Sequence, residues 1–161
     1  MSEQEGRRAA GMAKMQEVYG FTVDPADLPG RYAEVTVDHL FGTIWTDDTV
    51  ALRDRRILTI GVLAAQDKPE LLEIQFENAL RRGELTVDQL REVVVHLTHY
   101  IGWPLSTGVS GAAETVIRRR AAAGETGARA TPSTRASHAQ LARSWDGSAP
   151  RICSMSVGCM W

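Results

Sequence analysis

One stretch, LTVDQLREVVVHLTHYIGWP at residues 85–104, constrains the fold more than any other part of the chain. Thr86, followed three residues later by Gln89, is the pattern of a capping box, in which two side chains satisfy free amides at the start of a helix. Apolar residues then recur at helical spacing on one face until Gly102 and Pro104 end the helix. The residues of this face are Leu90, Val94, Leu97 and Ile101. The stretch therefore predicts a long amphipathic helix that packs against other helices.

Most of the remaining sequence also predicts helices. The segments are 2–19, 31–45, 49–65, 68–82 and 105–123. In 31–45 we expect one buried face, made of Tyr32, Val35, Leu40, Phe41 and Ile44. The segment 49–65 is almost wholly apolar after Arg56, which predicts a helix packed on several sides. Because no segment has the pattern of a strand, we expect an all-α compact bundle of about six helices.

Length, charge and composition point to one soluble domain. The chain has 161 residues, 43% apolar and 24% charged, with a net charge of −2, which gives no reason to expect nucleic acid as a partner. No apolar run approaches the roughly 20 residues needed to span a bilayer, so we expect no membrane contact. The first residues lack the apolar centre of a secretory signal, so we expect a cytoplasmic protein.

The composition changes sharply after Gly124. The following residues are rich in Gly, Ala, Ser, Thr, Pro and Arg, and such a segment buries too little apolar surface to offset its ordering entropy. Both cysteines lie in the final apolar peptide, ICSMSVGCMW. We therefore expect three parts: an N-terminal helix and loop at 1–30, a helical domain at 31–125 and a flexible tail at 126–161.

The run IWTDDTVALRDRRILTIGVLAAQDKPELLEIQFENALRRGELTVDQLREVVVHLTHYIGWP resembles the carboxymuconolactone decarboxylase family. The similarity lies in the order of elements over roughly residues 31–123: a tryptophan turn, an Arg-rich helix start, a helix ending ALxxG, and a helix ending YxGxP. The resemblance implies an all-helical homo-oligomer, a trimer or hexamer, with active sites near subunit boundaries. Related members of alkyl hydroperoxidase D type are peroxide-linked thiol enzymes.

The chain departs from this family at two places. The thiol enzymes carry a CxxC pair and a histidine on the helix equivalent to 68–82, where this chain has no cysteine and has Gln75 in place of the histidine. Glutamine forms hydrogen bonds but does not exchange a proton near neutrality. Decarboxylase-like members often read YCGVP where this chain reads YIGWP at 100–104. No metal-ligand spacing or phosphate-binding loop occurs, so we expect neither metal nor cofactor.

A decarboxylation or lactone isomerisation needs a cation to hold a carboxylate and an acid to protonate carbon. We expect the substrate-binding residues to be Arg53, Arg56 and Trp103, and the proton-transfer residues to be His96, Asp54 and Glu73. Each assignment has a structural alternative. His96 also suits a helix or subunit contact, the arginines suit intersubunit salt bridges, and Glu73 suits a solvated helix face.

Two functional hypotheses follow. In the first, the protein is an enzyme that transfers protons on a small carboxylic acid or lactone. In the second, the helical domain is a catalytically silent leader for a ribosomally made peptide that partner enzymes modify in its C-terminal segment. The residues open to such modification are Cys153, Ser154, Ser156 and Cys159. A read-through or frame-shifted extension would also explain the composition of the tail.

Overall fold

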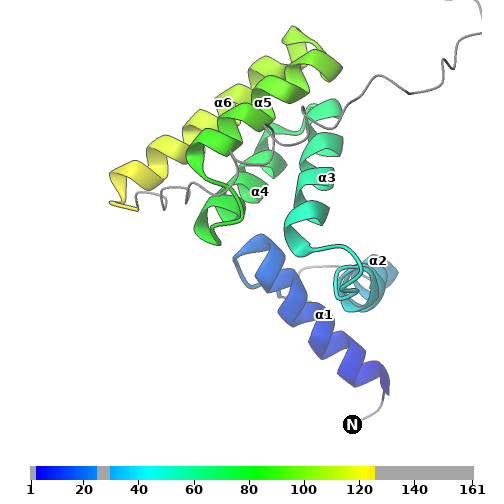
Figure 1. The fold of residues 1–161 in the computed structure, drawn as a ribbon. Coiled ribbons are helices and arrows are strands. Elements are labelled where there is room, and N and C mark those ends of the chain that lie inside the picture. The colour runs from blue at the N-terminus through cyan, green and yellow to red at the C-terminus, as the bar shows by residue number, and fades with distance from the viewer. Residues whose placement is uncertain (1–2, 25–29, 126–161) are drawn as a thin grey trace, which may run out of the picture. The chain divides into compact units, whose positions relative to one another are not determined.

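The computed structural model describes residues 3–24 and 30–125, and every regular element within these ranges is a helix. The first elements are α1 (Glu3–Tyr19), α2 (Gly30–Glu34) and the π-helix η2 (Val35–Ile44). They are followed by α3 (Leu52–Ala65), α4 (Pro69–Arg81), α5 (Val87–Ile101) and α6 (Trp103–Ala122), as Figure 1 shows. The prediction of an all-α fold with about six helices is confirmed for the described residues.

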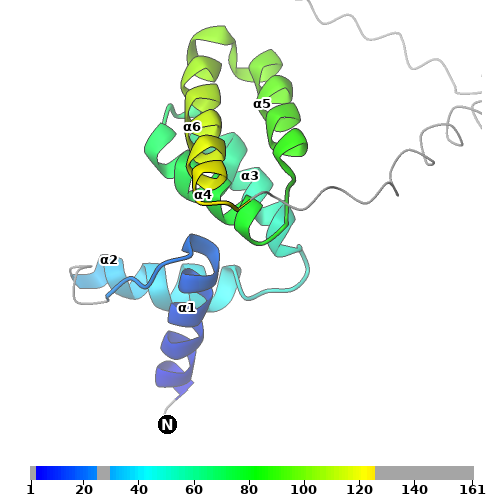
Figure 2. The same ribbon diagram turned by 90° about the vertical axis from the view of Figure 1, so that its left-hand side faces the viewer.

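Within the described part of the chain, helices α3 to α6 enclose the larger of two hydrophobic cores. Helix α6 lies beside both α4 and α5 (Figure 2). The centre of the core consists of side chains that are almost completely buried: Ile60, Leu72, Phe76, Leu90 and Val116. Each such burial stabilises the fold by about 1.5–3 kcal/mol, so this core is the main source of the bundle's stability.

The ends of α5 confirm the local signals in the sequence. The Thr86 hydroxyl accepts a hydrogen bond from the Gln89 amide at 3.1 Å, and the Gln89 side chain accepts one from the Thr86 amide at 3.0 Å. Gly102 then has φ of +82°, a conformation that other residues adopt only with strain. Pro104 follows in the first turn of α6, where its missing amide hydrogen costs nothing. The chain therefore turns sharply from α5 into α6.

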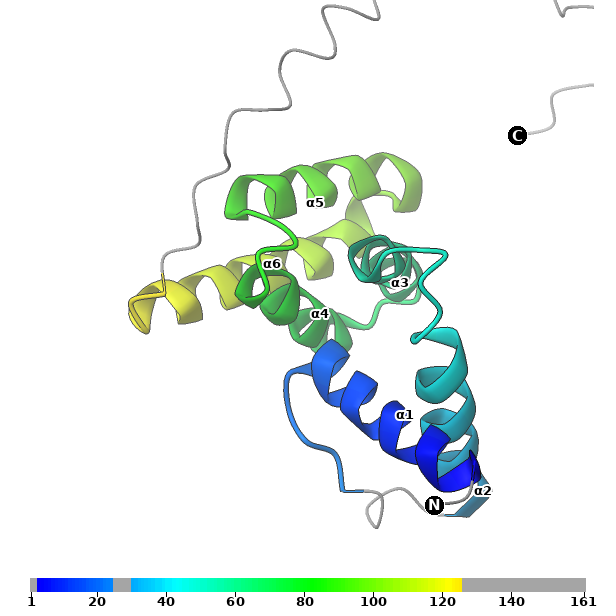
Figure 3. The same ribbon diagram turned by 60° about the horizontal axis from the view of Figure 1, so that its bottom comes forward.

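Helix α1 packs on η2 and forms a second, smaller core with it (Figure 3). Met15 and Val18 of α1 meet Val37 and Phe41 of η2 in this core. The backbones approach closely at Gly11, where an added Cβ would lie 2.1 Å from the carbonyl oxygen of Val37. The contact between the two helices therefore depends on a residue without a side chain.

Residues 31–45 are helical, but they bury a different face from the predicted one. Phe41 is buried as predicted, whereas Tyr32, for example, is 71% exposed. The predicted residues that are exposed instead are Tyr32, Val35, Leu40 and Ile44. The cause is the π-helical bonding of η2, shown by the hydrogen bond from the Trp45 amide to the Leu40 carbonyl at 2.9 Å. The wider turn places Val37, Phe41 and Trp45 on the inner side, four residues apart.

The prediction that the helix over 49–65 is packed on several sides is wrong for the single chain. Ile60 and Ala64 of α3 are buried in the main core. Leu58 and Val62 are 67% and 55% exposed, one helical turn apart on another face. Helix α3 therefore presents an apolar face that residues 3–24 and 30–125 leave uncovered.

Candidate functional site

A groove of about 330 Å³ between α3 and α5 brings together two of the predicted site residues. Arg53 in the first turn of α3 and His96 on α5 both line it. Most of the remaining surface is apolar, and the other lining residues are Ile57, Leu85, Gln89, Glu92, Val93 and Leu97. The groove therefore combines a guanidinium and an imidazole with an apolar wall.

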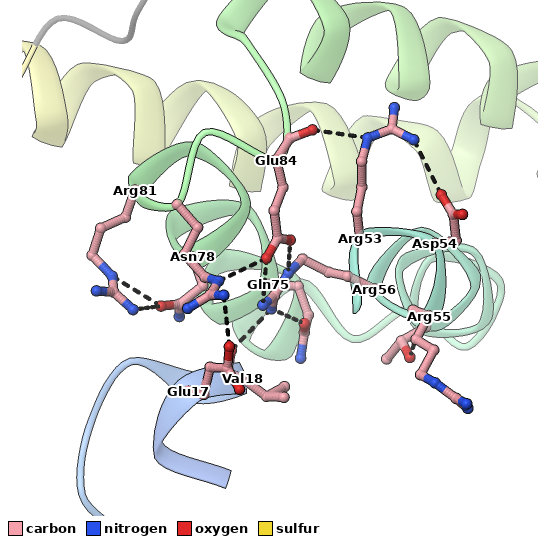
Figure 4. Close-up of polar contacts among 12 residues, drawn as sticks. Glu17, Val18, Arg53, Asp54, Arg55, Arg56, Gln75, Asn78, Arg81 and Glu84 are labelled. Atoms are coloured by element: carbon pink, nitrogen blue, oxygen red, sulfur yellow. Dashed lines mark hydrogen bonds and ion pairs between the residues drawn. The ribbon is translucent and has the colours of Figure 1, made fainter. Parts of the chain in front are cut away.

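Two hydrogen bonds hold the Arg53 side chain in place, and about half of the side chain is exposed to solvent. Its Nε donates to the carbonyl oxygen of Glu84 at 2.9 Å, and its Nη1 donates to the Asp54 carboxylate at 3.1 Å (Figure 4). The side chain is 47% exposed. These two bonds occupy two of the five N–H donors of a guanidinium, so Arg53 keeps donors for a bidentate contact with a carboxylate. Asp54 contacts Arg53 but is not among the residues that line the groove.

His96 is exposed on α5, and its ring lies 4.9 Å from the ring of Tyr100, centroid to centroid. Glu92 and Gln89 lie one and two turns earlier on the same face and also line the groove. The sequence pattern marked Gln89 only as a helix-capping residue and did not mark Glu92. Their spacing of four and seven residues from His96 is the signal that would have identified them.

Arg56 faces the interior and not the groove. It is 1% exposed, and its guanidinium donates to Glu84 at 2.5 Å, to Gln75 at 2.8 Å and to the carbonyl oxygen of Val18 at 2.9 Å (Figure 4). These bonds join α3 to α4, to the loop after α4 and to the end of α1. Because its N–H groups donate to partners inside the protein, Arg56 is not available to bind a substrate in the groove.

Gln75, where the family resemblance implies a histidine, lines a second pocket of about 280 Å³. The remaining lining residues are Tyr19, Phe21, Thr59, Leu63, Leu71 and Ile74. Burial raises the pKa of the Tyr19 hydroxyl, with a smaller contribution from Tyr32, so Tyr19 is neutral at physiological pH. The amide of Gln75 and this hydroxyl can form hydrogen bonds, but neither suits proton exchange near neutrality.

The other predicted site residues lie elsewhere. Glu73 on α4 pairs with Arg119 on α6 at 3.3 Å. Trp103 lines a third groove, between α5 and α6, together with His99. The structure therefore places neither Glu73 nor Trp103 among the residues that line the groove of Arg53 and His96.

The predicted modification sites lie outside the described residues. They are Cys153, Ser154, Ser156 and Cys159. Within residues 3–24 and 30–125, no three His, Cys, Asp or Glu side chains gather in a way that could hold a metal ion. None of the helices in these ranges is both long and apolar enough to cross a bilayer.

Over the described residues, these observations define a small all-helical protein with a groove lined by a guanidinium and an imidazole. The chain belongs to the carboxymuconolactone decarboxylase family, whose sequence profile matches residues 30–115. It is 28% identical over 78 residues to a 4-carboxymuconolactone decarboxylase of Acinetobacter baylyi. That alignment covers 48% of this chain and 58% of the relative, so the chain spans little more than half of the relative's length. No solved structure matches the chain significantly.

Proposed function

We propose that this protein binds a small carboxylic acid or a carboxylated lactone in the α3–α5 groove and transfers a proton on it. One observation carries the proposal: Arg53 and His96, from different helices, line the same groove. A guanidinium recognises carboxylate oxygens with two parallel hydrogen bonds. Histidine is the side chain whose ordinary titration lies nearest to neutral pH, which suits a general acid or base.

The residues of the groove suit the loss of a carboxyl group as carbon dioxide. In that reaction a carbon–carbon bond breaks and its electron pair stays on the substrate, delocalised toward a carbonyl oxygen. Arg53 donates hydrogen bonds to the oxygen on which this negative charge develops. Protonated His96 then delivers the proton to carbon, and its exposed ring regains a proton from water. The apolar wall lowers the local dielectric and strengthens these interactions.

The test uses 4-carboxymuconolactone, the compound in the relative's name, with carbon dioxide release as the readout. We expect His96→Gln to lower kcat/KM by about 10²–10⁴-fold, the usual contribution of general acid–base catalysis. We expect Arg53→Gln to raise KM as well, because it removes the cation that binds the substrate.

Two matched variants control for loss of structure. His39→Gln changes an exposed histidine of η2, and Arg91→Gln changes an exposed arginine of α5; both lie outside the groove. Both should retain activity, and circular dichroism should show the same helix content in all four variants. Turnover that survives in a folded His96→Gln protein would contradict the proposal.

A second candidate function is that of a leader domain for a modified C-terminal peptide. It is favoured by Gln75, which accepts a hydrogen bond from the buried Arg56 at the position where the family resemblance implies a proton-transfer residue. It is also favoured by the sequence, because both cysteines lie beyond residue 125. The intact mass of the protein from its native host decides this: each dehydrated serine removes about 18 Da, and an unmodified mass would contradict the candidate.

A further inference from the structure

The groove between α5 and α6 is separate from the proposed substrate site and has a different chemical character. Its volume is about 300 Å³. Residues from both helices line it: Val94, Val95, Thr98, His99, Trp103, Ser106, Thr107 and Ser110. The sharp turn at Gly102 joins the two helices, which lie side by side (Figure 1).

Three of the four hydroxyl groups that line this groove donate their hydrogen atoms to backbone carbonyls. Thr98 donates to the carbonyl oxygen of Val94 at 2.8 Å. Ser106 and Thr107 donate to the carbonyl oxygen of Trp103 at 3.1 Å and 3.0 Å. A hydroxyl has one hydrogen and two lone pairs. Thr98 and Ser106 are buried, so Thr107 is the exposed hydroxyl of the three that still offers a ligand hydrogen-bond acceptance.

His99 also offers a hydrogen-bond acceptor. Its Nδ1 lies 2.9 Å from the carbonyl oxygen of Val95. A carbonyl oxygen only accepts, so Nδ1 carries the hydrogen in this contact. In the neutral ring Nε2 then has a free lone pair.

Trp103 is the aromatic residue among those that line the groove, and it is 77% exposed. The face of an indole ring attracts cations through its quadrupole, more strongly than the face of a tyrosine or phenylalanine ring. The groove thus places the hydrogen-bond acceptors of His99 and Thr107 near a tryptophan that can attract a cation.

We propose that this groove binds an organic cation that bears N–H groups, namely a primary ammonium or a guanidinium on a short apolar chain. The cation lies against Trp103 and donates its N–H groups to Thr107 and His99, while Val94 and Val95 contact the apolar chain. Its ligand is opposite in charge to the carboxylate proposed for the α3–α5 groove.

The test follows the indole N–H signal of Trp103 in the proton–nitrogen correlation spectrum of the full chain. Trp103→Phe identifies this signal among those of the four tryptophans. The probe is n-butylammonium. Pentanoate matches its length with a negative charge, and butyltrimethylammonium keeps the positive charge without N–H donors.

We expect n-butylammonium to shift the Trp103 signal saturably, butyltrimethylammonium to bind more weakly, and pentanoate to leave the signal in place. Thr107→Val keeps the shape of the side chain and removes an acceptor, so it should weaken n-butylammonium binding about threefold or more. Thr115→Val is the matched control on α6, outside the groove, and should bind as the unchanged protein does.

Three outcomes would overturn the inference. The first is the absence of a saturable shift with n-butylammonium. The second is an equal shift with pentanoate, because a groove of acceptors must discriminate against an anion. The third is dissociation of an oligomer by Trp103→Ala in sedimentation velocity, which would show that a second copy of the chain covers the groove.

Discussion

At the scale of single residues, Arg56 shows how burial gives a charged side chain a structural role. Its guanidinium is 1% exposed and binds Glu84, Gln75 and the carbonyl oxygen of Val18. Replacing one partner of a buried ion pair costs about 3–5 kcal/mol where the other charge is left without compensation. Glu84 keeps a second partner, Arg82 at 2.8 Å, whereas Gln75 and the Val18 carbonyl lose this donor. We therefore expect Arg56→Met to lower the free energy of unfolding by about 3 kcal/mol, the lower end of that range, measured by urea denaturation.

Arg91 provides the comparison for Arg56. It also pairs with a glutamate, Glu114 at 2.8 Å, but the two side chains are 52% and 37% exposed. Pairs of this kind contribute at most about 1 kcal/mol, so Arg91→Met should have a small effect. If Arg56→Met proved as mild as Arg91→Met, the buried network would not be a main determinant of stability.

The same exposed pair predicts how stability depends on pH. The hydrogen bond from Arg91 lowers the pKa of Glu114 below its ordinary value of 4.5. A carboxyl group whose pKa is lower in the folded chain stabilises the fold fully above the unfolded value and loses this effect as the pH falls through the folded value. Below pH 4.5 the free energy of unfolding should therefore fall more steeply for the unchanged protein than for Glu114→Gln. Urea titrations at several pH values measure this difference, and parallel curves would contradict it.

The sequence grouped the arginines at the start of α3 but did not separate their roles. Residues one or two apart on a helix point in different directions, and Arg53 and Arg56, three apart, still differ by about 60° around the helix axis. Arg53 reaches the α3–α5 groove, Arg55 contacts Asp47 at 3.3 Å, and Arg56 enters the core. The partners of Arg56 lie 19 to 38 residues away in the chain, so no local pattern reveals its burial.

At the scale of elements, the packing of α1 on η2 depends on Gly11. An added Cβ would lie 2.1 Å from the carbonyl oxygen of Val37, which is backbone and cannot rotate away. Overpacking of this kind costs about 1–3 kcal/mol. We expect Gly11→Ala to lower the melting temperature and to loosen α1 from η2, which hydrogen exchange of the α1 amides measures.

Gly6 is the matched control in the same helix. No atom lies within 4 Å of a Cβ added there. Alanine favours a helix over glycine by about 1 kcal/mol, so Gly6→Ala should stabilise the protein slightly. Destabilisation by both variants to the same extent would contradict a specific backbone contact at Gly11.

Elements with local signals were predictable, and η2 was not. The capping box of Thr86 and Gln89 and the turn at Gly102 act within a few residues, and the structure has both. The π-helix depends on a tertiary contact, because Gly11 of α1 and Gly42 of η2 let the backbones of the two helices approach closely. The sequence of 31–45 by itself does not reveal this contact. The apolar residues of 31–45 fit an α-helix as well as a π-helix, and these two helices bury different faces. The predicted buried face was therefore wrong.

At the scale of the whole molecule, the sequence predicted the helical fold of the described residues, but not which candidate side chains share a groove. His96 and Arg53 are 43 positions apart, and only the packing of α3 against α5 places them in one groove. Glu73 and Trp103 have suitable chemistry, yet they belong to other surfaces. Spacing along one helix predicts which residues share a face, whereas the neighbour of that face depends on the tertiary fold.

The apolar face of α3 leads to a prediction about assembly. Leu58 and Val62 are exposed in the single chain although they lie one turn apart on a helix that also carries Arg53. Exposed apolar surface of this kind is typical of protein interfaces, and we expect a homo-oligomer, a trimer or hexamer, that buries it. Leu58→Glu places a charge in that contact and should shift the protein to monomers in sedimentation velocity at unchanged helix content.

Ala10→Glu, at an exposed position of α1, is the control for an added charge and should leave the assembly intact. A Leu58→Glu protein that sediments as the unchanged protein does would show that this face lies outside the contact.

Turnover by the Leu58→Glu monomer tests whether a single chain completes the site. Because Arg53 and Leu58 are on the same helix, the contact lies close to the α3–α5 groove along the chain. Activity retained in the monomer would mean that one chain completes the site, and activity lost with an intact fold would mean that the neighbouring subunit contributes to it.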